Sequence, residues 1–150
     1  MKTPVEIISD LWIGSLLTGN NYNFQELNNI SCLVNCTKDL NFLGKYKEFN
    51  VTIKNNMELY EIDKMFKYLI EVTEFINENL LNNKSVLIYC EDGIQKSPTI
   101  ALAYLMRYGK MSYENSLKSI KSKKKNAFQH NVDFIYAINK FKKYINSNNI

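Results

Sequence analysis

The chain has 150 residues, a length that suits one domain and buries roughly two-thirds of the surface that an unfolded chain exposes. Its composition, 45% hydrophobic and 23% charged, is ordinary for a globular protein, and no apolar stretch approaches the ~20 residues of a membrane-spanning helix. The net charge of +4 favours anionic partners only weakly, so the composition predicts neither nucleic acid nor membrane as a partner.

The order of apolar and polar residues predicts strands that alternate with helices. The first half is predicted to hold a hairpin, a short helix, a buried strand, a polar loop and a short strand, at residues 5–9 and 11–14, 24–29, 30–36, 38–50 and 51–54. The second half is predicted to hold a helix, a strand and three further helices, at residues 62–80, 85–89, 97–108, 113–123 and 131–145. This alternation implies a single α/β domain with a central, mostly parallel β-sheet flanked by helices. In such sheets ligands bind at the carboxyl ends of the strands.

The stretch VLIYCEDGIQKS at residues 86–97 has the pattern of an anion-binding site. A buried strand ends at Cys90, a short turn contains Gly93, and Ser97 begins a long helix. A strand, a tight loop and a helix start together direct backbone N–H groups and the helix dipole at one point. A cysteine at that point has a stabilised thiolate, which makes it a nucleophile.

Four stretches of the chain carry a resemblance to one family. They are EIISDLWIGSLLTGNNYNFQELNNISCLVNCT near the start, CEDGIQKS, SPTIALAYLMRYGKMSYENSLKSIKSKKK, and AFQHNVDFIYAINKF, which keeps Asn131 and has His130 in place of a proline. The chain resembles the small dual-specificity phosphatases, a group within the cysteine-dependent phosphatases, over most of its length. The resemblance implies the dual-specificity phosphatase fold and phosphorylated protein or peptide as the partner, with no cofactor and no metal.

The resemblance also implies roles for individual residues. Cys90 takes the place of the nucleophile, Gly93 that of the glycine that lets the loop amides converge, and Ser97 that of the hydroxyl that helps the thiolate leave. The phosphate group would be held by the loop residues Glu91, Asp92, Gly93, Ile94, Gln95 and Lys96.

Two residues of the loop region depart from the family pattern. Lys96 stands where the family has arginine, and a lysine cannot make the planar, two-pronged contact that a guanidinium makes to a phosphoryl group. Arg107 cannot replace it, because eleven residues of helix span about 16 Å. Tyr89 stands where the family has a histidine that orders the loop and helps to keep the thiol ionised.

A third departure concerns the proton donor. Matching Glu61 and Ile62 to the acidic–apolar pair of the family places Asn56 where the family has its aspartate. An amide cannot act as a general acid, and loss of that acid costs about 10²–10⁴-fold in rate. Glu58 is close enough in sequence to be a substitute, and that alternative stays open.

These departures favour a catalytically impaired phosphatase, a pseudophosphatase that keeps an anion-binding pocket and recognises phosphorylated protein. One alternative is an active phosphatase that uses Cys90 as nucleophile, Lys96 as a weak clamp and Glu58 as acid. Another is an interaction scaffold with a vestigial pocket. The oligomeric state is not indicated by the sequence.

The other reactive residues have less specific interpretations. The three cysteines fit reduced thiols, and without a signal-peptide core we expect a cytoplasmic or nuclear protein. Cys36 matches a second cysteine that forms a disulfide with the nucleophile in some relatives, with core packing as the alternative. Cys32 and His130 are predicted to be structural. The lysines at 118, 121, 123, 124 and 125 are predicted to form a solvated helix face, with a basic rim around the site as the alternative.

Overall fold

The computed structural model describes residues 4–39, 46–54 and 58–148, and its strands form one sheet in the order β1-β2-β5-β3-β4. The sheet consists of β1 (Val5–Ile8), β2 (Leu11–Ser15), β5 (Ser85–Cys90), β3 (Ile30–Asn35) and β4 (Lys47–Asn50). β1 pairs with β2 in antiparallel fashion, and all other pairs are parallel. The predicted α/β domain with a mostly parallel sheet is therefore confirmed.

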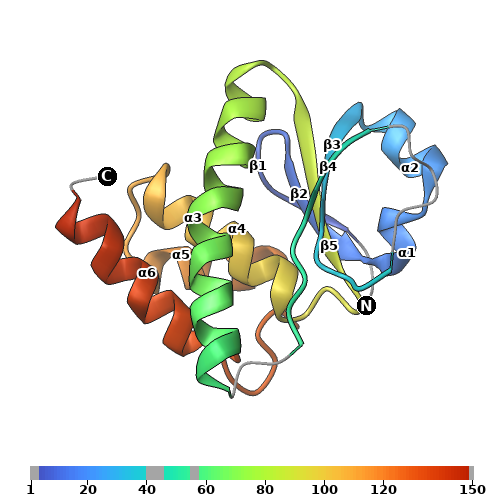
Figure 1. The fold of residues 1–150 in the computed structure, drawn as a ribbon. Coiled ribbons are helices and arrows are strands. Elements are labelled where there is room, and N and C mark those ends of the chain that lie inside the picture. The colour runs from blue at the N-terminus through green and yellow to red at the C-terminus, as the bar shows by residue number, and fades with distance from the viewer. Residues whose placement is uncertain (1–3, 40–45, 55–57, 149–150) are drawn as a thin grey trace.

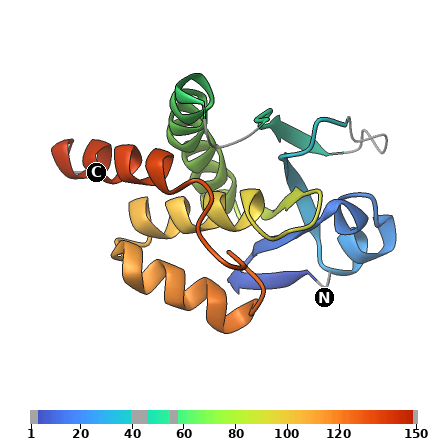
Figure 2. The same cartoon turned by 90° about the horizontal axis from the view of Figure 1, so that it is seen from below.

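Helices cover both faces of the sheet (Figure 1, Figure 2). One face carries α3 (Leu59–Leu81), α4 (Lys96–Arg107), α5 (Tyr113–Lys123) and α6 (Ile135–Ser147), and the other carries α1 (Leu16–Gly19) and α2 (Tyr22–Leu27). Successive side chains of a strand point to opposite faces, so Ile88 and Cys90 join the larger core while Leu87 and Tyr89 join the smaller one. The larger core thus lies directly beside the loop that follows Cys90.

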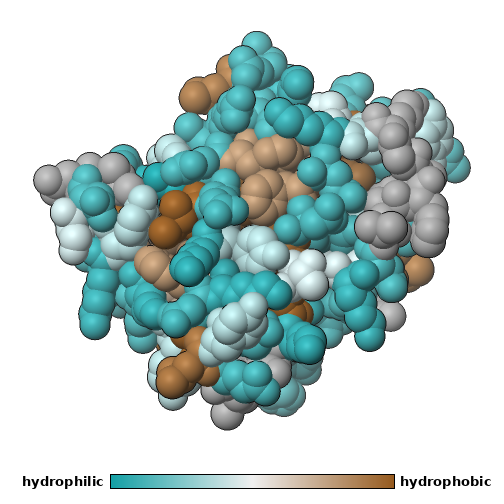
Figure 3. All heavy atoms as spheres, in the orientation of Figure 1, coloured by the Kyte–Doolittle hydropathy of each residue, from teal (hydrophilic) through white to brown (hydrophobic). Residues whose placement is uncertain are grey.

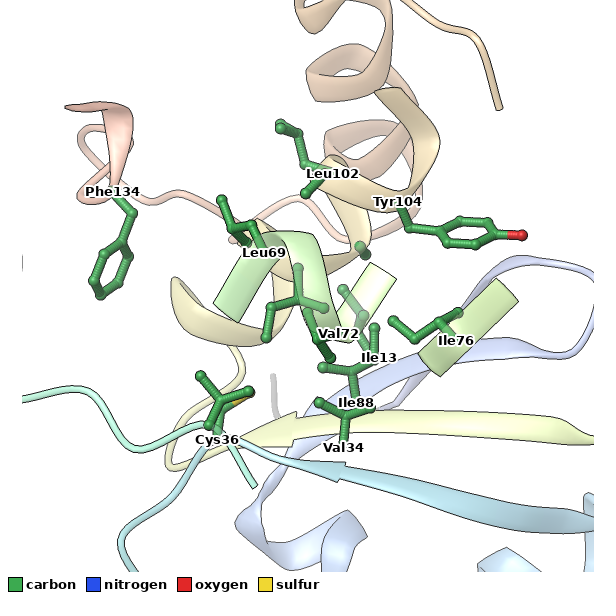
Figure 4. Packing of buried hydrophobic residues seen from close by; sticks show 14 of the residues in the cluster. Ile13, Val34, Cys36, Leu69, Val72, Ile76, Ile88, Leu102, Tyr104 and Phe134 are labelled. Carbon is green, nitrogen blue, oxygen red and sulfur yellow. The ribbon is translucent and has the colours of Figure 1, made fainter. Parts of the chain in front are cut away.

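The larger core depends on the apolar stripe of α3. Met65, Leu69, Val72 and Ile76 recur at helical spacing and are fully buried. They pack over the central strands, and Cys36 lies at the end of β3 beside the tip of β5 (Figure 4). The central helix therefore fixes the end of the sheet at which Cys90 stands.

The prediction for the fourth strand was wrong in position. The strand lies at Lys47–Asn50, inside the segment predicted as a loop, and residues 51–54 have no regular structure. β4 is an edge strand with polar side chains, so it lacks the apolar alternation that identifies a strand. Val51 and Ile53 are buried and imitate that alternation, but β3 ends at Asn35, whose carbonyl accepts one last bond from the Val51 N–H.

The last helix begins later than predicted. α6 begins at Ile135 rather than at residue 131, because the preceding residues hydrogen-bond to the loop after β5. The Gln95 side chain donates to the carbonyl of Asn131 and accepts from the N–H of Asp133, which holds this stretch outside the helix. The short helix α1 was not predicted at all, whereas α5 has the predicted bounds.

Among the described residues, no helix has the length and apolar character that crossing a membrane requires. The face shown in Figure 3 is largely hydrophilic, and its apolar side chains emerge singly or in small groups.

Candidate active site

The thiol of Cys90 lies at the carboxyl end of β5, in contact with the first turn of α4. Its Sγ is 3.4 Å from the hydroxyl oxygen of Ser97 and also 3.4 Å from the Ser97 backbone nitrogen, which donates to it. The Ser97 hydroxyl lies 3.3 Å from the carbonyl oxygen of Gly14 on β2. Cys90 is 1% exposed, and Ser97 is fully buried. The structure thus brings the predicted nucleophile and the predicted hydroxyl into direct contact.

The turn between them is held by a glycine and by two backbone hydrogen bonds. Gly93 has φ +75°, a left-handed conformation, and a Cβ there would lie 3.1 Å from the Gly14 carbonyl oxygen, so a side chain would be strained. The Glu91 carbonyl accepts from the Leu16 N–H, and the Ile94 carbonyl accepts from the Phe128 N–H. The loop is therefore fixed against the start of α1 on one side and against the segment after α5 on the other.

Two hydrogen-bond donors of the loop are already paired with acidic side chains of the same loop. The Lys96 ammonium lies 3.5 Å from the carboxylate of Glu91, and its side chain is 19% exposed. The carboxylate of Asp92 accepts from the Ile94 N–H at 3.0 Å. An incoming phosphate group must compete with both carboxylates, so we expect a weaker anion site than the bare backbone pattern implies.

A pocket of about 280 Å³ opens beside Cys90. The loop residues Glu91, Asp92, Gln95 and Lys96 line it, and so do Lys54, Asp133 and Phe134. The last three were not identified from the sequence, because they lie far from the loop along the chain. Asp133 is held there by Gln95 and by a hydrogen bond from the Asn131 amide at 2.9 Å.

Tyr89 lies on the opposite face of the sheet from Cys90. Its ring packs so closely on α1 that a Cβ at Gly19 would lie 2.4 Å from it. Burial raises the pKa of Glu48 on the neighbouring edge strand β4, and the side chains of Asn35, Asn50 and Tyr89 oppose that effect. Tyr89 therefore joins α1 to the edge of the sheet, a structural role that a histidine of smaller size would fill less well.

The predicted acid position cannot be placed, since Asn56 lies outside the described residues. The alternative donor, Glu58, is exposed and immediately precedes α3. Nearby, the buried carboxylate of Glu61 accepts from the Lys54 N–H at 3.1 Å, which fixes Lys54 beside the first turn of α3. The carboxylates that line the pocket within the described ranges are those of Glu91, Asp92 and Asp133.

The side chain of Arg107 contacts α3 rather than the loop, in agreement with its predicted distance from the loop. Its guanidinium donates to the Ile70 carbonyl at 2.9 Å, to the Thr73 hydroxyl at 3.1 Å and to the Glu74 carboxylate at 3.1 Å, all on α3. It therefore joins α4 to α3 and does not replace the missing clamp.

The cysteines are free thiols in this structure. Cys36 follows the last residue of β3, and its N–H donates to the Tyr89 carbonyl at 2.8 Å, so Cys36 lies just past the end of β3, beside the end of the adjacent strand β5 that carries Cys90. Burial, and then the negative charge of Cys90, raise the pKa of the Cys36 thiol well above its usual range. Cys36 packs as a neutral core residue, and its pairing with Cys90 stays a prediction.

Four of the five lysines that were predicted to form a solvated helix face are exposed, those at 118, 121, 123 and 125, and one, Lys124, is buried. The ammonium of Lys121 donates to the Ala127 carbonyl, and that of Lys123 donates to the Ile7 carbonyl on β1. Lys124 is only 5% exposed. The predicted solvated face is therefore confirmed except at Lys124, although two of its exposed lysines also hydrogen-bond to neighbouring segments.

Within the residues that the structure describes, no group of three His, Cys, Asp or Glu side chains could hold a metal ion.

A thiol lies at the end of a central parallel strand and is hydrogen-bonded to a serine in the first turn of the next helix. This arrangement is typical of cysteine-dependent phosphatases. The model of the dual-specificity phosphatase catalytic domain matches residues 11–144. The chain belongs to the dual-specificity phosphatase family.

Individual relatives agree with this assignment. Putative tyrosine phosphatase 123R of Invertebrate iridescent virus 6 is 28% identical over 149 residues, which cover 97% of this chain and 96% of the viral protein. Human dual specificity protein phosphatase 9 is 30% identical over 127 residues, which cover 82% of this chain but only 32% of that longer protein. The solved structure of human tyrosine phosphatase-like serine/threonine/tyrosine-interacting protein has a TM-score of 0.84 at 17% identity, covering 96% of this chain and 98% of that chain, and so shares the fold.

Proposed function

We propose that this chain is a catalytically impaired dual-specificity phosphatase whose loop still binds the phosphate group of a phosphorylated protein. The observation that carries the proposal is the state of the loop. Cys90 and Ser97 are in contact, while the cation of the loop is a lysine in place of arginine, and this residue, Lys96, forms an ion pair with Glu91. Within the family the phosphorylated partner is a protein or peptide, and reduced thiols suit the cytoplasm or nucleus.

Binding and turnover make different demands on this site. Binding needs converging backbone N–H groups and positive charge. The left-handed conformation of Gly93 lets the loop backbone turn tightly, and Lys96 supplies the positive charge. Turnover also needs a planar clamp on the transferring phosphoryl group and a proton donor for the leaving group. Lys96 is a point donor, and Asn56 carries an amide, so both requirements of turnover are weakened.

An active phosphatase is the second candidate. The intact contact of Cys90 with Ser97 favours it, because these two groups serve only the covalent steps. In that case Lys96 is a weak clamp, and the proton comes from Glu58 or from Asp133 in the pocket wall.

Inorganic phosphate should stabilise the protein against heat. At ten times the Kd, binding contributes about 1.4 kcal/mol, which raises the thermal midpoint of a chain this size by roughly 3–6 °C. Lys96→Ala should weaken phosphate binding about tenfold, because a hydrogen bond to a charged group contributes about 1.5–3 kcal/mol. Thermal-shift titrations with phosphate and with phosphotyrosine measure both effects.

Lys67→Ala is the matched control, since Lys67 is exposed on α3 and its loss removes the same charge away from the pocket. We expect this variant to bind phosphate like the unmodified protein. A midpoint that stays constant up to tens of millimolar phosphate would contradict the binding function and favour the scaffold.

A further inference from the structure

Lys54 reaches the pocket of Cys90 from outside the loop. It lines the same pocket of about 280 Å³ as Cys90 and Lys96, although it belongs to the stretch between β4 and α3. Figure 1 shows this stretch descending from β4 to the start of α3. The Lys54 N–H donates to the buried carboxylate of Glu61 at 3.1 Å, and the neighbouring Ile53 is 5% exposed. The backbone of Lys54 is therefore held at the pocket wall, and a flexible four-carbon stem carries its ammonium group.

The two lysines of the pocket come from different parts of the fold. Lys96 lies in the first turn of α4, whereas Lys54 comes from the stretch before α3. Within the described ranges, no other cationic side chain lines this pocket. A phosphate group bound between these two segments can therefore meet one ammonium group from each of them.

The carboxylates of the pocket give the second lysine its importance. Glu91, Asp92 and Asp133 line the pocket, so three carboxylates accompany two ammonium groups. The Lys96 ammonium lies 3.5 Å from the Glu91 carboxylate, which offsets its charge. A phosphate monoester carries roughly two negative charges at pH 7. With Lys96 alone, this dianion would enter a pocket in which negative charge prevails, so the charge of Lys54 bears directly on the affinity.

We propose that Lys54 is a second phosphate-binding residue, which forms a two-lysine clamp with Lys96. One guanidinium contacts two phosphoryl oxygens, whereas an ammonium is a point donor. Two ammonium groups from two segments each contact a different oxygen, and so they supply the second contact and the second charge without the planar geometry. The proposal rests on the proposed function, because it names a further residue that holds the same anion.

The place of Lys54 in the chain agrees with binding without turnover. The stretch between β4 and α3 is where the resemblance to the family places the proton donor, and in this chain it brings a cation to the pocket. An ammonium that contacts the bound phosphate stabilises the ground state as well as the transition state. Such uniform binding lowers the Kd without raising the rate of the chemical step.

Calorimetric titration with inorganic phosphate tests the clamp. We expect Lys54→Met to weaken phosphate binding about tenfold, because it removes a charge-assisted hydrogen bond. Lys54→Arg should retain most of the affinity, and the double variant Lys54→Met/Lys96→Met should bind more weakly than either single variant. Lys67→Met is the matched control, since Lys67 is exposed on α3 and its loss removes an equal charge outside the pocket.

Lysine acetylation of the unmodified protein separates a direct contact from a remote effect of charge. With N-hydroxysuccinimidyl acetate, the deprotonated amine attacks the acyl carbon, an amide forms and N-hydroxysuccinimide leaves. A phosphate ion that contacts an ammonium group therefore slows acetylation of that lysine. We expect saturating phosphate to slow acetylation of Lys54 and Lys96 several-fold and to leave that of Lys67 unchanged, with each site quantified by mass spectrometry.

The outcomes distinguish the clamp from the proposed function. Equal phosphate affinity of Lys54→Met and Lys67→Met would overturn the clamp and leave phosphate binding by the loop in place. A lower thermal midpoint of Lys54→Met without phosphate, together with unchanged affinity, would show a merely structural lysine and overturn the clamp as well. Should Lys54→Met fail to fold, Lys54→Gln gives the same comparison. Absence of phosphate binding by the unmodified protein would overturn both the clamp and the proposed function.

Discussion

Hydrolysis of an aryl phosphate by this chain should be at least about 10³-fold slower than hydrolysis by relatives that keep the arginine, the histidine and the aspartate. Loss of the general acid alone costs about 10²–10⁴-fold. The exchange of a planar guanidinium for the Lys96 ammonium adds to that loss, because the clamp acts on the transition state. Initial rates at pH 6–8 with a chromogenic substrate measure the deficit.

Two variants assign any residual rate. Cys90→Ser should abolish it, whereas Cys36→Ser should leave it in place, since Cys36 is a neutral core thiol. Family-level turnover that disappears in Cys90→Ser would contradict the pseudophosphatase and establish the active enzyme.

Restoring the lost side chains should restore catalysis. Lys96→Arg supplies the two-pronged clamp, and Asn56→Asp supplies a proton donor. Because both act on one transition state, the double variant should exceed the product of the single effects and gain at least about 10²-fold. Lys96→Arg alone should tighten oxyanion binding more than it raises turnover, and Asn56→Asp should help most with poor leaving groups.

The third restoration, Tyr89→His, carries a structural cost. Tyr89 is 1% exposed, and its ring packs on Gly19 and within the smaller core. Replacing it should lower the free energy of unfolding by roughly 1–3 kcal/mol. The triple variant is therefore best compared with the double variant below its thermal midpoint.

A folded double variant that stays inactive would place the defect in the geometry of the loop. If Glu58→Gln changes the residual rate while Asn56→Asp does not, the acid position is wrong. Asp133→Asn tests the remaining carboxylate of the pocket wall in the same assay.

The fold was predictable because most elements carry strong local signals. The stripe of α3 and the apolar run of β5 are visible in the sequence, and both elements lie where they were expected. β4 was misplaced because an edge strand needs no apolar face, and its partner β3 decides where pairing ends. The start of α6 was predicted too early, because Gln95 hydrogen-bonds to the residues that precede the helix. Such a contact between distant segments leaves no trace in the periodicity of apolar residues.

The candidate site was predictable only where it is continuous in sequence. The contact of Cys90 with Ser97 follows from the short loop and the helix start between them. Lys54, Asp133 and Phe134 reach the site through tertiary packing, and each belongs to a stretch without a motif of its own. For Lys124 a lysine run predicted exposure, and only the docking of Phe128 on the loop shows why that one member is buried.

Phosphorus-31 NMR of a stoichiometric mixture with a phosphotyrosine peptide tests the central claim most directly, because it reports binding and hydrolysis together. We predict that the peptide phosphorus signal broadens or shifts on binding and then persists for hours, and that Lys96→Ala reduces the change. Rapid growth of the inorganic phosphate signal would contradict catalytic impairment. An unperturbed peptide signal at millimolar concentrations would contradict phosphate recognition by this loop.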